Sequence, residues 1–351
     1  MWIYLSIFDV YVDKRQTQKR GISAYPFVCD EFLYLSLWHY LWMQRIHIPM
    51  VILTELQKIY FIRKMREAQQ KMRRNKKAVF IGLTGLDYVY YLDGFPEENS
   101  KCKTGEYAKY IGGPAANAAI TYAALGGDAT LITAYGSSVE SNTITEELTA
   151  LGVKVINVSQ DDKLPGISTI CITGEGKRTI ISGQNQYESI NLSEIELDGY
   201  DLALFDCNQQ DVSLPLLEKV DCDVVLDAGS YKPNVEKYLE KATIVISSEQ
   251  FKDEQGRDIF AMPYDNIVMR AMTRGEKSIR TQDNEIDIEP VDCIDSLAAG
   301  DIFHGAFCFA FLEKGLSFEE ALRYASKVAS ESVKYKGPRA WMASERIKGN
   351  G

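Results

Sequence analysis

Short β-forming runs alternate with helix-forming segments along most of this chain of 351 residues. The alternation begins with a strand at 78–84, a helix of small residues at 115–125 and a second strand at 129–135. Further strands are expected at 153–158, 202–205, 224–227, 244–247 and 266–272, and two long helices at 301–314 and 317–336. Repeated β-α-β alternation produces a mostly parallel sheet, and both faces of such a sheet need helices to cover them. The sequence therefore predicts a doubly wound α/β domain.

Two parts of the chain interrupt this alternation with strands that have no helix between them. The β-forming runs 168–173 and 178–182 are joined by Gly174-Glu175-Gly176-Lys177, a turn typical of a hairpin. An earlier run at 88–92 ends in the turn Asp93-Gly94-Phe95-Pro96. We expect the segments at about 88–111 and 166–183 to form a small antiparallel sheet. Such a sheet would act as a lid over the carboxyl ends of the parallel strands.

Composition and charge exclude several classes of protein. The chain is 46% apolar and 25% charged, as expected of a globular protein. Its seven cysteines are scattered without paired spacing and it has only three histidines, which predicts reduced thiols in the cytoplasm and no structural zinc. The net charge is −10, but residues 1–76 carry 13 Lys and Arg against 6 Asp and Glu, so the remaining chain is strongly acidic. An acidic body argues against nucleic acid as a partner.

Residues 1–76 differ from the rest and are assigned to an N-terminal extension, while residues 77–343 form the predicted domain. The aromatic run 32–43 is cut off by Gln44 and Arg45, well short of the about 20 residues that span a bilayer. From Thr54 onward the extension is basic and helix-prone. Three interpretations stay open: a mis-assigned start, with Met65 or Met72 as the first residue; a basic helix that docks on a partner or an anionic membrane surface; and a membrane anchor.

The run Asp295-Ser296-Leu297-Ala298-Ala299-Gly300-Asp301 closes a loop and opens an apolar helix. Its small residues leave backbone amides bare at a helix N-terminus, where the helix dipole favours an anion such as phosphate. A carboxylate in that first turn is unsuited to binding an anion, so Asp301 is better explained as a base beside one. An anion site next to a proton acceptor indicates phosphoryl transfer from a nucleotide to a hydroxyl. The chain has no P-loop sequence, and no Gly-x-Gly-x-x-Gly follows its first strand.

A second motif, Gly112-Gly113-Pro114-Ala115-Ala116-Asn117, lies near the front of the domain. Shorter stretches at 82–87, 90–96, 273–275 and 337–339 accompany the two motifs in a fixed order. Together they resemble the ribokinase-like carbohydrate kinases, the PfkB family. The resemblance covers about residues 77–342, and the ordered pair of motifs is more specific than either motif alone.

The resemblance implies transfer of the ATP γ-phosphoryl group to a sugar hydroxyl in a doubly wound domain with a β-lid. Asp301 would be the base, and the amides of Ala298, Ala299, Gly300 and Asp301 would form the anion hole. The other implied residues are the sugar site of Asp87, Gly112, Gly113 and Asn117, the nucleotide contacts Thr273 and Gly275, and Glu249, which would organise Mg²⁺ through water. The partners are then ATP and a small sugar, and a homodimer through the lid is a further expectation.

Three positions depart from the family pattern. Ala298 replaces a glycine, and it is strained if the position needs a positive φ. We expect the anion hole to survive because Gly300 and Asp301 are retained. Glu249 follows Ile246-Ser247-Ser248, so the usual Asn three residues before it is missing. Ser278 replaces the second glycine of the nucleotide loop, which we expect to be a mild change.

The sequence leaves open which acceptor is phosphorylated and whether the protein is a sugar kinase. An anionic sugar would need a cation, for which Lys177 and Arg178 are the candidates, but Asn208 favours a neutral sugar or polyol. A nucleoside kinase would need aromatic side chains, which Tyr88, Tyr90 and Tyr91 could supply. A sugar-sensing regulator without catalysis is the alternative from another class. His304 is expected to be a packed or solvent-facing helix residue, because no carboxylate lies three or four positions further along.

Overall fold

The computed structural model describes residues 76–183 and 185–348. The chain divides into two units, residues 1–74 and 75–351, and all described residues belong to the second. The interpretations offered for the N-terminal extension therefore concern residues that, apart from Lys76, lie outside the described ones. None of the helices formed by the described residues combines the length and apolar character that crossing a bilayer requires.

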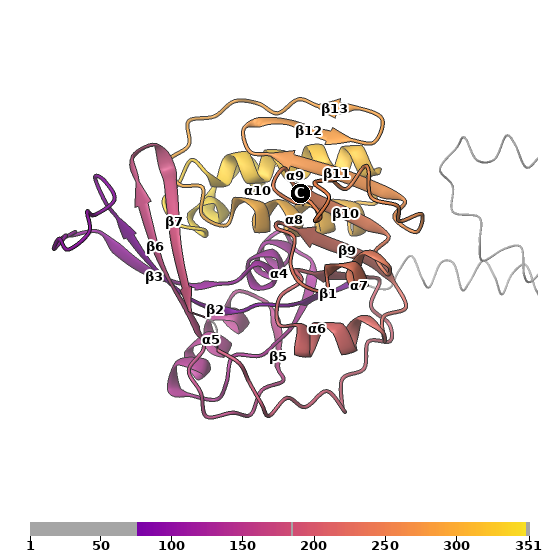
Figure 1. Cartoon of the computed structure of the whole chain (residues 1–351), viewed down its shortest axis with the longest axis horizontal. Helices are drawn as coiled ribbons and strands as arrows, with labels where there is room; N and C mark the ends of the chain where they lie inside the picture. Colours follow the sequence, from indigo (N-terminus) through magenta and orange to yellow (C-terminus); the bar gives the residue numbers. More distant parts are fainter. Residues whose placement is uncertain (1–75, 184, 349–351) are drawn as a thin grey trace, which may run out of the picture. The chain divides into compact units, whose positions relative to one another are not determined.

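The main sheet of the described residues has nine strands in the order β13-β12-β11-β10-β9-β8-β1-β4-β5 (Figure 1). Their bounds are β1 (Lys77–Ile81), β4 (Asp128–Thr133), β5 (Lys154–Asn157), β8 (Leu202–Phe205), β9 (Asp223–Ala228), β10 (Ile244–Ser248), β11 (Met269–Arg274), β12 (Lys277–Thr281) and β13 (Glu285–Ile286). All neighbours from β5 to β11 pair in parallel, while β12 and β13 are antiparallel additions at one edge. The strand order runs outward in both directions from β1. A crevice for a ligand is expected at such a switch point, beyond the carboxyl ends of the strands.

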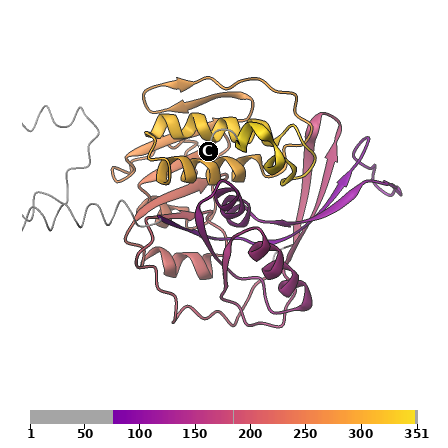
Figure 2. The ribbon, with the colours of Figure 1, turned by 180° about the vertical axis from the view of Figure 1, so that it is seen from behind.

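Helices cover both faces of this sheet, as predicted. The larger core packs one face against α4 (Pro114–Ala124), α5 (Val139–Ala150), α8 (Ala299–Leu312) and α9 (Phe318–Ser332). The second core packs the other face against α6 (Gln210–Leu217) and α7 (Val235–Leu239). The yellow C-terminal helices lie in front of the sheet in Figure 2, which shows the molecule from behind. Strand residues alternate between the two cores, with Phe80 in the first and Ile81 in the second, because side chains alternate along a strand.

A second, four-stranded sheet stands apart from the main one in both views (Figures 1 and 2). It consists of β3 (Tyr107–Gly112), β2 (Gly85–Tyr91), β6 (Gly166–Thr173) and β7 (Lys177–Gly183), in that order. The expected lid is therefore present, and its hairpin turns through the short helix η2 (Gly174–Gly176). Its outer pairs, β2 with β3 and β6 with β7, are antiparallel as expected, whereas β2 and β6 pair in parallel at its centre. Two α/β units separate these strands in the sequence, so β6 is not constrained to return beside β2 as a hairpin partner would be.

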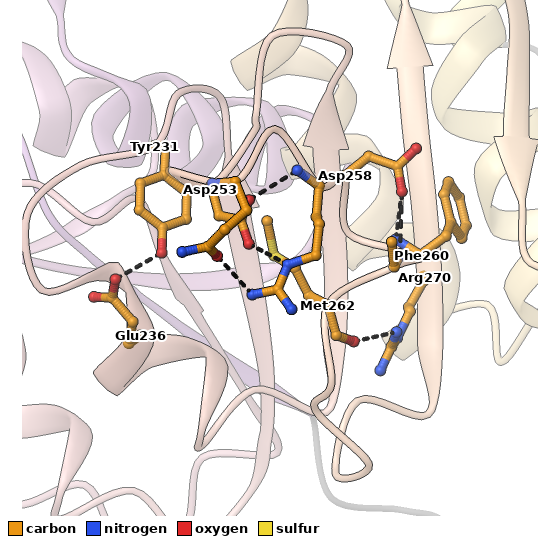
Figure 3. Close-up of polar contacts among 10 residues, drawn as sticks. Tyr231, Glu236, Asp253, Asp258, Phe260, Met262 and Arg270 are labelled. Atoms are coloured by element: carbon orange, nitrogen blue, oxygen red, sulfur yellow. Dashed lines mark hydrogen bonds and ion pairs between the residues drawn. The ribbon is translucent and has the colours of Figure 1, made fainter.

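Residues 249–268, between β10 and β11, form neither helix nor strand. Arg270 organises this segment, because its guanidinium donates to the backbone carbonyls of Ile259 (3.0 Å), Met262 (3.1 Å) and Tyr264. Figure 3 shows the contact of Arg270 with Met262, near Asp253 and Asp258 of the same segment. Arg257 donates to Asp253 and Arg280 donates to Asp258, and these pairs fix the segment's other turns. The strand predicted at 266–272 begins only at Met269, since this segment occupies the preceding residues.

The six described cysteines, at 102, 171, 207, 222, 293 and 308, are unpaired. Unpaired thiols are what the scattered spacing predicted. Cys207 and Cys308 are buried, and burial raises the pKa of each thiol. A raised pKa leaves little of the reactive thiolate at neutral pH, so these two residues act as small core side chains.

Ala298 has a left-handed backbone, with φ 60° and ψ 11°, immediately before α8. The position therefore needs a positive φ. Of the two alternatives considered for Ala298, strained or unstrained, the strained backbone is the one present. An L-residue with a Cβ pays roughly 1–2 kcal/mol for this conformation, whereas glycine adopts it freely.

We therefore expect Ala298→Gly to raise the free energy of unfolding by about 1 kcal/mol, because it removes the clash of the Cβ at positive φ. Urea unfolding of both proteins would measure the difference. Ala299→Gly is the matched control, since Ala299 is the first residue of α8 and should gain nothing. A loss of stability in Ala298→Gly would contradict the strain argument.

Candidate active site

The two motifs at opposite ends of the domain meet at the carboxyl ends of the parallel strands. Asn117, in the first turn of α4, donates from Nδ2 to Oδ2 of Asp301 over 2.7 Å. Asp301 lies in the first turn of α8. The predicted sugar residue and the predicted base are thus direct neighbours, although 184 positions separate them in the sequence.

The N-terminus of α8 presents open backbone amides. The amide of Ala299 donates to Ser296 O over a long 3.3 Å, and the first regular bond of the helix is made by Ile302 to Ala298 O. Within the described part of the chain, the amides of Gly300 and Asp301 have no backbone or side-chain acceptor. Unpaired amides at a helix N-terminus are suited to an anion. Ala298 contributes the turn that exposes them.

Asp301 is partly buried, and burial raises its pKa to about 7, with the nearby Asp227 adding to the rise. The donated hydrogen bond from Asn117 and the positive charges of Arg178 and His304 act in the opposite direction. A carboxyl group that titrates near neutral pH is well matched to accepting a proton from a hydroxyl.

His304 is buried in α8, so of the two predicted alternatives, packed or solvent-facing, it is packed. Its Nδ1 lies 2.8 Å from Gly300 O, and its Nε2 lies 3.2 Å from Ile246 O. The sequence offered no carboxylate for this imidazole, but Asp227 Oδ2, at the end of β9, lies 3.5 Å from Nδ1. Burial raises the pKa of Asp227, and His304 partly offsets that rise. The pair links α8 to two strands of the main sheet.

Asp87, on β2, lies against the second motif. A Cβ at Gly112 would meet Asp87 Oδ2 at 2.1 Å, so only glycine leaves room for this carboxylate. Gly113 has φ +99°, and a Cβ there would lie 2.2 Å from Leu83 O. Burial raises the pKa of Asp87 to about 6, while Ser168 and Arg339 lower it. Asp87, Gly112 and Gly113 therefore lie together, and Gly113 directly precedes the helix that carries Asn117.

Arg339 is a part of this site that the sequence analysis did not assign. Its Nη2 donates to Asn117 Oδ1 over 2.6 Å and to Ile111 O over 2.9 Å. Burial lowers its pKa to about 10, and the carboxylates of Asp301 and Asp87 oppose that shift. The sequence analysis named the closing stretch 337–339, which contains Arg339, only as part of the family resemblance. It assigned no role to the side chain.

The lid touches the loop before α8 at several points. Tyr91 donates its hydroxyl to Asp295 Oδ2 over 2.9 Å, and Ser296 Oγ donates to Gly176 O over 3.1 Å. Arg178, on β7, donates to the carbonyl of Ser296. These contacts hold the lid hairpin and strand β2 against the loop that carries the open amides.

The three tyrosines considered for a nucleoside acceptor do not line this site together. Along β2, Tyr88 and Tyr90 alternate with Asp87, so both point to the opposite face of the lid. The ring of Tyr90 stacks there on Tyr107, with 6.4 Å between the centroids. Tyr91 shares the face of Asp87, but its hydroxyl is bonded to Asp295.

Thr273, Gly275 and Glu249 lie together at the ends of β10 and β11. The amide of Glu249 donates to Thr273 O over 3.1 Å, and Gly275 forms the tight turn to β12 with φ +66°. The Glu249 carboxylate faces Lys277 at 3.7 Å, and both side chains are more than half exposed. The residues described here contain no group of three His, Cys, Asp or Glu arranged to hold a metal. Ser278, the third departure from the family pattern, accepts from Arg274 and donates to Glu285.

The chain is similar to known kinases along almost all of this domain. The nucleoside kinase of Methanocaldococcus jannaschii is 23% identical over 281 residues, covering 75% of this chain and 92% of that protein. The ribokinase of Bacillus subtilis is 23% identical over 274 residues, covering 72% and 91%. The ribokinase of Cryptococcus neoformans in complex with ADP superposes with a TM-score of 0.66 at 17% identity, covering 79% of this chain and all of that one. That likeness shows a shared fold.

The family model described as pfkB family carbohydrate kinase matches residues 75–226 and 269–345. The match includes both motifs, the lid and the closing stretch with Arg339, and it leaves out residues 227–268. The unmatched part contains the irregular segment and the position of the missing Asn. The chain therefore belongs to the pfkB family of carbohydrate kinases, which are phosphotransferases with an alcohol group as acceptor.

Proposed function

We propose that this protein is an ATP-dependent kinase of a small neutral carbohydrate and that it acts in the cytoplasm. The contact of 2.7 Å between Asn117 and Asp301 supports the proposal, because it joins the side chain predicted to bind the sugar to the carboxyl group predicted to be the base, whose pKa is about 7. The ribokinases among its relatives support a sugar acceptor, and the unpaired cysteines support the compartment.

In this mechanism, Asp301 accepts the proton of the acceptor hydroxyl as the hydroxyl oxygen attacks the γ-phosphorus of ATP. The bond from that phosphorus to the bridging oxygen breaks, and ADP leaves with the electron pair. The amides at residues 298–301, of which those of Gly300 and Asp301 are open, stabilise the negative charge of the transferring group without reorganising. Asn117 and Asp87 hold the acceptor, and Thr273 and Gly275 lie beside the nucleotide.

Glu249 fits the role of organising Mg²⁺ through water. Its carboxylate is exposed at the carboxyl end of β10, and Mg²⁺ usually keeps several waters and takes one or two carboxylates together with phosphate oxygens. The bound metal would neutralise charge on the ATP phosphates. Lys277, which faces Glu249, can exchange this carboxylate for a phosphate because both side chains are exposed.

A neutral acceptor is favoured by the balance of charge around the pocket. The carboxylate of Asp87 faces the guanidinium of Arg339, and that of Asp301 faces the guanidinium of Arg178, so these two cations are already balanced by carboxylates. The opposite orientation of Tyr88 and Tyr90 argues against stacking a nucleobase on them. A nucleoside kinase and a sugar-sensing regulator without catalysis remain the competing functions to test.

The first test measures ADP release with Mg-ATP over a panel of sugars, phosphosugars and nucleosides. We expect a neutral sugar to stimulate release, and Asp301→Asn to reduce kcat by at least about 10²-fold because the base is lost. The matched control is Asp283→Asn, at an exposed residue that belongs to neither motif. Stimulation by nucleosides alone would favour the competing kinase, and bound ATP without release would favour the regulator.

The raised pKa of Asp301 predicts a pH dependence of both activity and stability. Because the ionised carboxylate is the base, kcat/KM should fall tenfold per pH unit below about pH 7. The folded state binds this proton more tightly than the unfolded chain, so this group stabilises the fold at low pH and loses that effect as pH rises through 7. Asp301→Asn should therefore melt higher than the parent at pH 8, with a smaller difference at pH 5. An equal difference at both pH values would contradict the shift.

We also propose that two copies associate through the outer face of the lid. Ile181 and Tyr107 are 63% and 72% exposed there, beside the tyrosines Tyr88 and Tyr90. An apolar sheet face of this kind is typical of an interface. Sedimentation velocity of the full chain should show a dimer that Ile181→Asp dissociates. Val268→Asp, at an equally exposed residue outside the lid, should leave it intact; a monomeric parent protein would refute the proposal.

A further inference from the structure

The guanidinium of Arg339 contacts a side chain of the site as well as backbone carbonyls. Its guanidinium donates to Asn117 Oδ1 over 2.6 Å, and Asn117 Nδ2 donates to Asp301 Oδ2 over 2.7 Å. The three groups form a continuous chain of hydrogen bonds from the C-terminal segment to the base. Arg270, another half-buried arginine with several partners, donates only to backbone carbonyls. That difference suggests a role for Arg339 beyond holding the chain together.

The chemistry of the amide makes this chain directional. A guanidinium has only donors, and an ionised carboxylate has only acceptors. The amide of Asn117 satisfies both neighbours in one orientation, with its oxygen toward Arg339 and its nitrogen toward Asp301. Without the guanidinium, the amide could turn and present its oxygen to Asp301, which would repel an ionised base.

The path of the segment that carries Arg339 is fixed independently. The amide of Gly337 donates to Asp295 Oδ2 over 2.8 Å. Gly337 has φ +75°, and a Cβ there would meet the Tyr110 hydroxyl at 2.3 Å. Arg339 also donates to Ile111 O and Pro338 O. The guanidinium is therefore held in place before any ligand binds.

We propose that Arg339 is a positioning residue that fixes the amide orientation of Asn117 and so aims the ionised carboxylate of Asp301 at the acceptor hydroxyl. The inference rests on the proposed function, in which Asp301 is the base. Other charged or titratable groups also face Asp301: Asp227 from β9, His304 from α8 and Arg178 from β7. Arg339 differs from them because the hydrogen-bonded side chain of Asn117 lies between its guanidinium and Asp301.

The first experiment follows the protonation of Asp301 without requiring catalysis. Carbon-13 NMR of the full chain with labelled aspartate would give the titration midpoint of Asp301, assigned by its absence in Asp301→Asn. We expect Arg339→Gln to raise the midpoint by about one pH unit, and by less than about 0.3 unit in an Asn117→Ala background. Arg323→Gln, at an exposed residue of α9, should leave it unchanged. Equal shifts in both backgrounds would overturn the proposal, because Arg339 would then act independently of Asn117.

The second experiment measures kinetics with Mg-ATP and D-ribose. Arg339→Gln should lower kcat at pH 7 about tenfold while the KM for ATP changes less than twofold, and its effect should shrink in the Asn117→Ala background. A full loss of activity in both backgrounds would indicate a merely structural role.

If Arg339→Gln does not fold, Arg339→Lys should shift the titration midpoint of Asp301 in the same direction but less. If the parent protein has no activity with any acceptor, the proposed function fails, and the NMR titration still decides the role of Arg339.

Discussion

The buried carboxylate of Asp295 joins three parts of the molecule that the sequence keeps far apart. Its oxygens accept from the amide of Leu297 in the loop before α8, from the amide of Gly337, and from the Tyr91 hydroxyl on the lid. Asp295 is almost fully buried, so removing it would leave these donors without a partner in a site closed to water. The open amides of α8, the approach of the lid and the position of Arg339 therefore depend on one side chain.

A second buried carboxylate holds the opposite side of the site. Asp206, at the end of β8, accepts from the amides of Leu83, Ala115 and Asn208. A Cβ at Gly82 would overlap its oxygens, so the close approach of β1 depends on that glycine. The amide of Ala115 belongs to the first turn of α4, and Asp206 therefore occupies that helix N-terminus with a protein carboxylate. The N-terminus of α8 is left open, so of these two helix ends only that of α8 can receive an anion from outside the chain.

The sequence predicted those features that depend on local pattern. The alternation of strands and helices fixes the parallel sheet, and the hairpin at 166–183 follows from its turn, because both are properties of neighbouring residues. The parallel pairing of β2 with β6 depends on contacts between distant strands and was missed. The motifs pointed to Asp301 and Asn117, but the positive φ of Ala298 and the contacts of Asp227 and Arg339 with the site appear only once the chain is folded. Glu249, Thr273 and Gly275 were predicted near the nucleotide, and they cluster with one another, yet their roles there stay predictions.

The energetics of Asp301 explain why so many groups surround it. Burial and the negative charge of Asp227 disfavour its ionised form, and this lowers the stability of the folded protein at neutral pH. Asn117, Arg178 and His304 lower the pKa of Asp301 and so favour the ionised form that the proposed base requires. Each comes from a different part of the fold: Asn117 from α4, His304 from α8 itself and Arg178 from the lid. Because one of the compensating charges, that of Arg178, belongs to the lid, the proton affinity of Asp301 depends on the position of that sheet.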